Sequence, residues 1–142
     1  MTWLILALLA ATLSGFTDFF IKLSAGKIHA TFSGFVINLV STLVLLPFIF
    51  CYKAKGENIF KFGTNGLAYS IIAGIIIGFL TIVMLKMYSQ GTNLSIGSPL
   101  IRIGSVVLVI SLGILFLKEP ITLKFVVGFL LSLAGLYLLV GK

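Results

Sequence analysis

Five apolar stretches separated by short polar segments dominate the chain. They cover about residues 2–23, 31–52, 67–88, 94–117 and 121–140. Each stretch is close to the ~20 residues that a helix needs to cross the hydrocarbon core of a bilayer. Helix is the expected conformation because an isolated open strand would leave backbone N–H and C=O groups unpaired in lipid. The pattern predicts an all-α integral membrane protein with five transmembrane helices in a single domain, residues 1–142.

The polar segments between these stretches resemble membrane loops. Residues 24–30 (SAGKIHA) and 89–93 (SQGTN) are short, and residues 53–66 hold most of the charge of the loops. In the tight connector KEP we expect Glu119 near the N-cap of the last helix and Pro120 in its first turn, where a missing N–H costs least. The first apolar stretch lacks the preceding positive charge of a signal peptide, so we expect it to be retained as a helix.

Composition supports a membrane domain with little water-exposed surface. The chain is 60% hydrophobic and only 9% charged, whereas soluble domains carry about 25% charged residues. The net charge of +7 does not indicate nucleic-acid binding, because the lysines lie between apolar runs and form no continuous basic face. We expect a multi-pass protein of the cell (inner or plasma) membrane whose lysines anchor it at the interface. Cys51, the one cysteine, is expected to be a small buried hydrophobe.

The lysines are spread almost evenly over the two sides of the membrane. With five crossings, the side that holds the N-terminus (side A) is opposite to the side that holds the C-terminus (side B). Side A has five lysines at or near it: Lys53, Lys55, Lys61, Lys118 and Lys124. Side B has four: Lys22, Lys27, Lys86 and Lys142. Two interpretations stay open: side A is cytoplasmic by a weak excess of charge, or the chain inserts in both orientations and pairs with an inverted copy of itself.

Small residues recur at spacings that let helices approach closely. The third stretch contains GIIIG, from Gly74 to Gly78, and the fifth has Gly128 and Gly135 on one face. Such patterns are common in membrane helices. We expect Gly74 and Gly78 to pack within the bundle, and Gly128 and Gly135 to serve an interface between subunits.

Polar side chains occur at a similar depth in four of the predicted helices. At a rise of about 1.5 Å per residue, Asp18, Asn38, Thr81 and Arg102 lie roughly one to two turns in from side B. Ionisable groups inside a membrane segment are functional candidates. The predicted substrate-binding residues are Asp18, Asn38 and Arg102, with Ser14, Lys22 and Thr81 as further members.

The charges of this group predict the kind of ligand. Asp18 is the one carboxylate against Arg102, Lys22 and, nearer the interface, Lys86, so a water-filled cavity there would favour an anion. Arg102 would hold an anionic group, Asp18 would orient Arg102 or exchange a proton, and Asn38 would add hydrogen bonds.

Simpler interpretations of the same residues stay open. Lys22 and Lys86 could extend to the interface as anchors, and Asp18 could pair only with Lys22, four residues later on the same helix face. The fourth helix could start at the Ser98–Pro99 pair, with Ser98 as its N-cap and Pro99 as its first residue. Arg102 would then lie in the first turn, near the lipid headgroups.

The chain offers little for catalysis. His29 is the one histidine and lies in a connector, and no cysteine cluster or paired carboxylates accompany it. Metal sites and acid–base catalysis need such combinations. We therefore expect no enzyme activity, no catalytic residues, no metal and no cofactor.

The C-terminal third, residues 88–142, closely resembles the end of an EamA-type repeat of the drug/metabolite transporter superfamily. The resemblance rests on a small-residue turn, a Pro-containing helix, an apolar run that ends in Glu, and a last helix with G…L…AG. These features are carried by Glu119, Pro120, Ile121, Thr122, Gly128, Ala134 and Gly135. The segment SGFTDFFIKLSAGK is similar to the first helix of the repeat, with Lys22 near its end.

The resemblance implies a half-sized transporter. Family members usually contain two inverted five-helix repeats with the substrate path between them, and this chain has one, so it would need an inverted partner, most simply itself. Compared with the related four-helix small multidrug transporters, Ser14 falls where their proton-coupling glutamate would lie, which speaks against export of cationic drugs.

Three functions follow from the sequence. The preferred one is alternating-access transport of a small polar or anionic metabolite by an antiparallel homodimer in the lipid bilayer. The alternatives are flipping of a lipid-linked sugar or phosphate, and a non-transporting membrane subunit of a larger complex.

Overall fold

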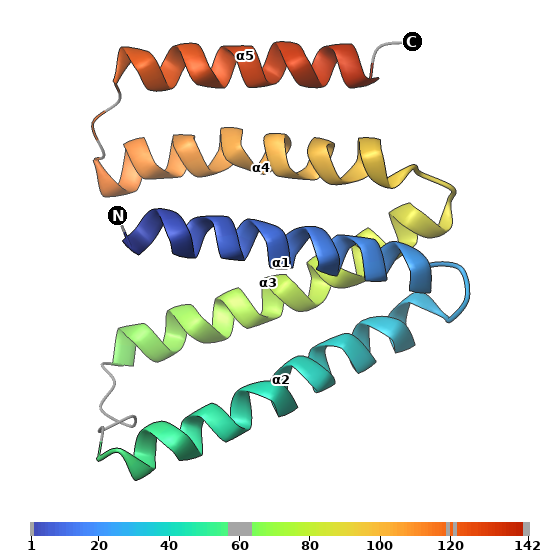
Figure 1. Ribbon diagram of the computed structural model, residues 1–142, viewed down its shortest axis with the longest axis vertical. Helices are drawn as coiled ribbons and strands as arrows, with labels where there is room; N and C mark the ends of the chain where they lie inside the picture. Colours follow the sequence, from blue (N-terminus) through green and yellow to red (C-terminus); the bar gives the residue numbers. More distant parts are fainter. Residues whose placement is uncertain (1, 57–63, 119, 121, 141–142) are drawn as a thin grey trace. The chain divides into compact units, whose positions relative to one another are not determined.

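A computed structural model describes residues 2–56, 64–118, 120 and 122–140. These residues form five helices, which coincide with the five predicted stretches (Figure 1). The helices are α1 (Thr2–Ser24), α2 (Ala30–Ala54), α3 (Thr64–Ser89), α4 (Leu94–Leu117) and α5 (Leu123–Val140). The predicted all-α fold is confirmed.

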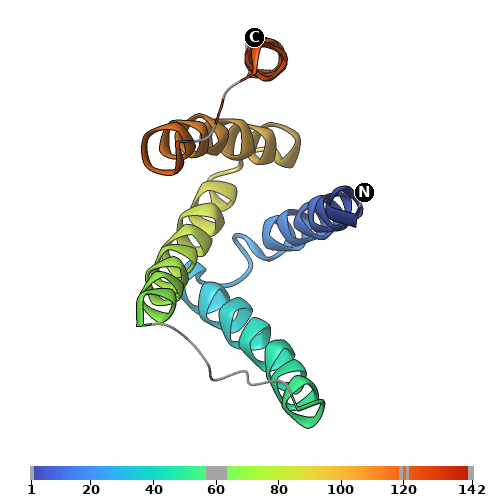
Figure 2. The same ribbon diagram turned by 90° about the vertical axis from the view of Figure 1, so that its left-hand side faces the viewer.

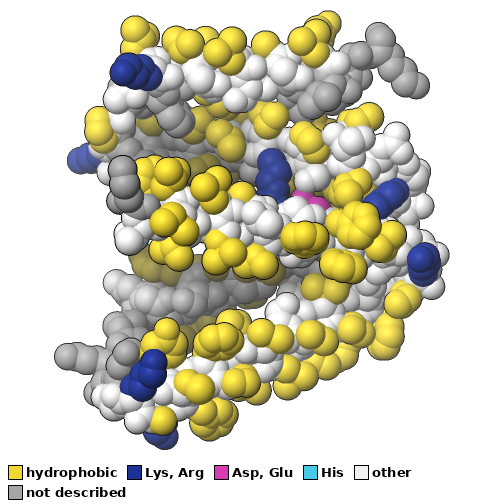
Figure 3. Space-filling view, viewed as in Figure 1, with side chains coloured by type: hydrophobic (Ala, Val, Ile, Leu, Met, Phe, Trp, Pro, Cys, Tyr) yellow, Lys and Arg dark blue, Asp and Glu magenta, His cyan; other side chains and the backbone are white. Residues whose placement is uncertain are grey.

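Helices α1 to α4 are long and apolar enough to cross a membrane. Helix α5 has 18 residues, fewer than each of the other four helices, but within the range of about 17–25 that can span a bilayer. Hydrophobic side chains cover the sides of the helices in Figure 3. Trp3 on α1 is 70% exposed and Phe50 on α2 is 68% exposed, as expected of residues whose solvent is lipid rather than water.

Contacts divide the chain into two units, Met1–Gly91 with helices α1 to α3 and Thr92–Lys142 with α4 and α5. The single domain over residues 1–142 stays a prediction. Cys51, near the end of α2, is exposed, so the expectation of a buried thiol is wrong. Its helix end lies away from the packed part of the first unit.

The packed part of the first unit lies at the side-B end of its helices. Helices α1, α2 and α3 converge at this end and diverge toward the other (Figures 1 and 2). The buried apolar side chains of the described residues come from the last turns of α1 and α3: Ile21, Met84, Leu85 and Tyr88. Polar groups on the inward face of these helix ends are therefore drawn into the packed region, whereas Lys86 and Ser89 in the last turn of α3 are exposed.

A tight turn brings α1 and α2 together at this end. Gly26 has a φ of 80°, a left-handed conformation that glycine adopts without the steric cost of a Cβ atom. The Lys27 N–H donates to the Ser24 carbonyl at 3.1 Å and closes the turn. The short connector therefore places the end of α1 beside the beginning of α2.

Helix α4 begins well before its proline. The Gly97 N–H donates to the Asn93 carbonyl at 2.8 Å, so a helical hydrogen bond forms ahead of Pro99, which lies inside α4. The alternative in which the helix begins at Ser98 is wrong. Arg102 is then the ninth residue of α4, about 12 Å along the axis from Leu94 at 1.5 Å per residue.

The last helix begins later than expected. The Val126 N–H donates to the Thr122 carbonyl at 3.2 Å, which makes Thr122 the cap position and Leu123 the first residue of α5. Pro120 therefore lies in the connector and not in the first turn of α5, and that expectation is wrong. Glu119, and the expected first residue Ile121, lie outside the described residues.

Candidate functional site

Three polar side chains are buried where α1, α2 and α3 converge. Asp18 of α1 is 4% exposed, Ser33 of α2 is 4% exposed and Thr81 of α3 is 8% exposed. The depth estimate from the sequence brought Asp18 and Thr81 to one level, and both are buried in the same packed end. A buried carboxylate is costly unless it is hydrogen-bonded or paired, so Asp18 marks this end as a functional candidate.

Ser33 was missed by the sequence analysis. Its hydroxyl donates to the Ser24 hydroxyl at 3.4 Å, and Ser24 in turn donates to the Ile21 carbonyl at 2.9 Å. The sequence signal that could have found Ser33 is its position opposite Ser24 across the short connector, because a tight turn brings the residues on its two sides together. These hydroxyls join the beginning of α2 to the end of α1.

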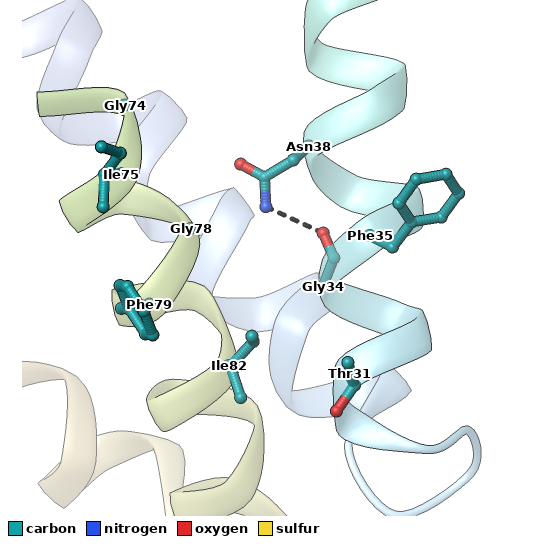
Figure 4. Close-up of a pocket in the computed structure, with 9 residues that line it drawn as sticks. All are labelled: Thr31, Gly34, Phe35, Asn38, Gly74, Ile75, Gly78, Phe79 and Ile82. Carbon is teal, nitrogen blue, oxygen red and sulfur yellow. Dashed lines mark hydrogen bonds between the residues drawn. The ribbon is translucent and has the colours of Figure 1, made fainter. Parts of the chain in front are cut away.

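Asn38 lies on α2 and lines an open groove between α2 and α3 (Figure 4). Its amide nitrogen donates to the Gly34 carbonyl at 2.8 Å, and its carbonyl oxygen points across the groove toward α3. Thr81 instead donates its hydroxyl to the Ile77 carbonyl at 2.8 Å. Asn38 is thus placed to offer an acceptor to a ligand in the groove, whereas Thr81 is buried in the helix contact.

Lys22 ties α1 to the end of α3. Its ammonium group donates to the Tyr88 carbonyl at 3.3 Å and lies 5.5 Å from the centroid of the Tyr88 ring. A cation is stabilised at a helix C-terminus, where carbonyl groups have no intrahelical partner. Lys22 is half-buried and has a structural partner within the first unit, in addition to any role toward a ligand.

Replacing Lys22 with Met is expected to lower the free energy of unfolding by about 1.5 kcal/mol, the lower end of the range for a hydrogen bond to a charged group, because the Lys22–Tyr88 bond is long and only part-buried. The change is measured as a lower melting temperature in detergent. Lys27→Met, on an exposed residue of the connector, is the matched control and should leave the melting temperature unchanged. Equal melting temperatures for both variants would contradict a stabilising Lys22–Tyr88 contact.

Ser14 and Arg102 complete the predicted set. Ser14 lies one turn before Asp18 on α1 and is half-buried. Arg102 lies on α4, in the second unit, and is exposed; its own carbonyl accepts a hydrogen bond from the Ser105 hydroxyl at 2.9 Å. The pairing of Arg102 with Asp18 stays a prediction.

The glycine at the close contact between α2 and α3 is Gly34. A Cβ atom built on Gly34 would lie 3.3 Å from Cγ1 of Ile82 and 3.7 Å from Cδ1 of Leu85. The GIIIG pattern predicts this packing role for Gly74 and Gly78, where an added Cβ would meet nothing within 4 Å. That expectation is wrong for contacts within the chain, because both glycines line the open groove instead.

Gly34→Leu is expected to destabilise the fold by about 1–3 kcal/mol, the usual cost of forcing extra atoms into a packed contact. Thermal unfolding in detergent measures the effect. Gly15→Leu is the control, because a Cβ at Gly15 meets nothing within 4 Å. If Gly34→Leu melts at the same temperature as Gly15→Leu, the close approach of α2 and α3 at Gly34 is refuted.

Gly128 lines a second groove, of about 300 Å³, between α4 and α5 together with Ile103, Val106 and Ser132. A Cβ atom on Gly128 or on Gly135 would meet nothing within 4 Å. Both glycines thus have room beside them, and their role in a subunit interface stays a prediction.

The polar groups at the packed end of α1, α2 and α3 are suited to binding a polar ligand. Among the described residues, no group of three or more His, Cys, Asp and Glu side chains lies close enough together to hold a metal ion. Within the part of the chain that the structure describes, the buried or half-buried polar groups at the packed end include the Asp18 carboxylate, the Lys22 ammonium group and several hydroxyls, in helices that are otherwise mostly apolar. Such groups can bind and orient a polar ligand within the membrane.

The helices and the polar groups buried between them define a multi-pass α-helical membrane protein. Residues 1–141 match the model of the EamA-like transporter family. The chain belongs to this family, whose members are membrane transporters of the drug/metabolite transporter superfamily.

A relative of similar length supports the assignment. An uncharacterized protein of Methanocaldococcus jannaschii is 33% identical over 138 residues, which cover 97% of this chain and 96% of that protein. No solved structure matches the chain significantly. The match over nearly the whole of both chains agrees with a single five-helix repeat, half the size of the usual two-repeat transporters.

Proposed function

We propose that the protein transports a small polar or anionic metabolite by alternating access, as a homodimer of two copies inserted in opposite orientations. The observation that carries the proposal is the burial of Asp18, 4% exposed, inside the membrane span of a transporter-family protein. An ionisable group is retained at such a position against a cost in free energy, and binding of substrate is the usual reason in a transporter.

An anionic substrate suits the charges near Asp18. Lys22 lies one turn further along α1, and the depth predicted for Arg102 in α4, about two turns from side B, is comparable with that predicted for Asp18. Because two cations accompany one carboxylate, a cavity bounded by these groups would attract a carboxylate or phosphate. In this proposal Arg102 binds the anion, Asp18 orients Arg102 or exchanges a proton, and Asn38 adds hydrogen bonds.

The homodimer follows from the number of repeats. Two-repeat transporters place the substrate path between halves of inverted topology, and this chain supplies one such half. The near-balance of lysines on the two sides is what insertion in both orientations requires. A second copy can therefore serve as the missing half without any other subunit.

The test is uptake into liposomes that contain only the purified protein. A panel of radiolabelled carboxylates and organic phosphates is offered, with organic cations of similar size as the control. Uptake of one or more anions above protein-free liposomes is expected. A protein that is a monomer and transports nothing alone would instead be a non-transporting subunit.

Flipping of a lipid-linked sugar or phosphate is the second candidate, and one observation favours it. A groove of about 580 Å³ between α1 and α2 combines apolar side chains such as Phe16 and Phe20 with the hydroxyls of Ser24 and Ser33. An amphiphile could place its chain against the phenylalanines and its headgroup at the serines. Movement of a fluorescent phosphate-linked lipid between leaflets, without uptake of soluble anions, would select this function.

A further inference from the structure

The groove between α2 and α3 has a glycine-rich wall that the described residues of the first unit leave unpacked. It has a volume of about 380 Å³, and its wall on α3 consists of Gly74, Ile75, Gly78, Phe79 and Ile82 (Figure 4). Glycine is about 1 kcal/mol less favourable than alanine inside a helix. Since no described atom of the first unit lies within 4 Å of a Cβ built on Gly74 or Gly78, packing within this unit does not account for these two glycines.

The groove-facing residues are arranged symmetrically about the middle of α3. The helix runs from Thr64 to Ser89, so its midpoint falls between Ile76 and Ile77. Gly74 and Phe79 are equally far from this midpoint on its two sides, and so are Ile75 and Gly78. Two copies of α3 that cross antiparallel at their midpoints would therefore bring Gly74 opposite Phe79, and Ile75 opposite Gly78.

Each of these pairs joins a large side chain to a glycine. The Phe79 ring, 68% exposed in the single chain, and the Ile75 side chain, 56% exposed, would fill the spaces above the two glycines. Close approach of helix backbones at small residues is the main source of packing energy between helices in a membrane, where hydrophobic association is absent. The antiparallel crossing is thus self-complementary in shape.

We propose that the α2–α3 groove binds helix α3 of a second, inverted copy, with Phe79 of each copy packed on Gly74 of the other and Ile75 on Gly78. This inference rests on the proposed antiparallel homodimer and names the surface that forms it. Asn38, which lines the same groove, then lies at the boundary between the two copies, where the substrate path of a two-repeat transporter runs.

Disulfide cross-linking between differently tagged copies tests the register. In a Cys51→Ser background, one copy carries Ile75→Cys and the other carries Gly78→Cys, and the membranes are treated with a mild oxidant. At least about half of the chains are expected to form a linked heterodimer, because disulfides form when Cα atoms lie about 4.4–6.8 Å apart. The control is Ile76→Cys with Ile77→Cys, which lies even closer to the midpoint but on the opposite face of α3, and it should link at least about fivefold less.

Swapping the large and the small side chain of a facing pair provides a second test. Gly74→Leu is expected to convert most of the dimer into monomer, measured by light scattering in detergent, and Phe79→Ala in the same chain should restore the dimer. The two residues are five positions apart on one helix, so the rescue acts between copies. A wild-type monomer would overturn both this inference and the homodimer. An inverted dimer that links through Ile76 and Ile77, or that is unaffected by Gly74→Leu, would overturn the α3 surface alone.

Discussion

Asp18→Asn is expected to lower substrate uptake by proteoliposomes at least about tenfold. Asp18 is 4% exposed, so the variant replaces a buried carboxylate that the packed helix ends surround. Loss of one hydrogen bond to a charged group costs about 1.5–3 kcal/mol, and 1.4 kcal/mol corresponds to a factor of ten. Arg102→Gln should cause a similar loss, because it removes the positive charge assigned to the anion.

A variant with both Asp18→Asn and Arg102→Gln shows whether the two side chains act together or independently. If Asp18 orients Arg102, the variant with both changes should be no less active than either single variant, since the two side chains act as one unit. Lys124→Gln, on an exposed residue at the beginning of α5, is the control and should keep uptake within about twofold of wild type. Wild-type rates in both Asp18→Asn and Arg102→Gln would remove these residues from the site.

Both ends of the chain are expected to be accessible from both sides of the membrane. In a Cys51→Ser background, Thr2→Cys or Gly141→Cys, neither of which changes the lysine balance, is labelled in intact cells with a membrane-impermeant maleimide. About half of the chains should react from outside for each position, because lysines are nearly balanced between the two sides. Removal of Cys51 is necessary because this residue is exposed. Labelling of one end only would exclude the antiparallel homodimer.

Variants that insert in only one orientation test whether uptake requires copies in both orientations. Ala25→Lys with Gln90→Lys adds charge to side B, and Ala54→Lys with Asn65→Lys adds charge to side A. Each variant alone should insert in one orientation and lose most of its uptake, whereas co-expression should restore activity. Full activity of either biased variant alone would show that an inverted partner is not needed.

The boundary of α4 illustrates how far local sequence signals reach. Ser98 and Pro99 have the pattern of a cap followed by a first helical residue, yet the helix starts at Leu94. Asn93 is also a residue type preferred at an N-cap, and its backbone carbonyl accepts from the Gly97 N–H although its side chain makes no cap hydrogen bond. Both patterns are local and both are chemically sound, so the sequence alone left the depth of Arg102 open by one turn.

The glycines illustrate a different limit. GIIIG was the most visible small-residue motif, but the contact between α2 and α3 uses Gly34, beside Ile82. Gly34 has no second glycine four residues away, only Ala30, and such a small-residue pair is too common in membrane helices to single out one contact. Which glycine lies at a contact depends on the rotation of two helices against each other, and this rotation is set by side chains far away in the sequence.

The sequence by itself determined the five helices, the membrane class and the family resemblance, because the free energy of transfer into lipid is a property of each segment separately. It also predicted that Asp18 and Thr81 lie at one depth, because depth follows from position along a helix. Only the tertiary structure decided that Ser33 joins them, that Lys22 binds the end of α3, and that Gly74 and Gly78 face an open groove. These features depend on the rotation and convergence of helices, which arise from contacts between segments and are not contained in the periodicity of any one of them.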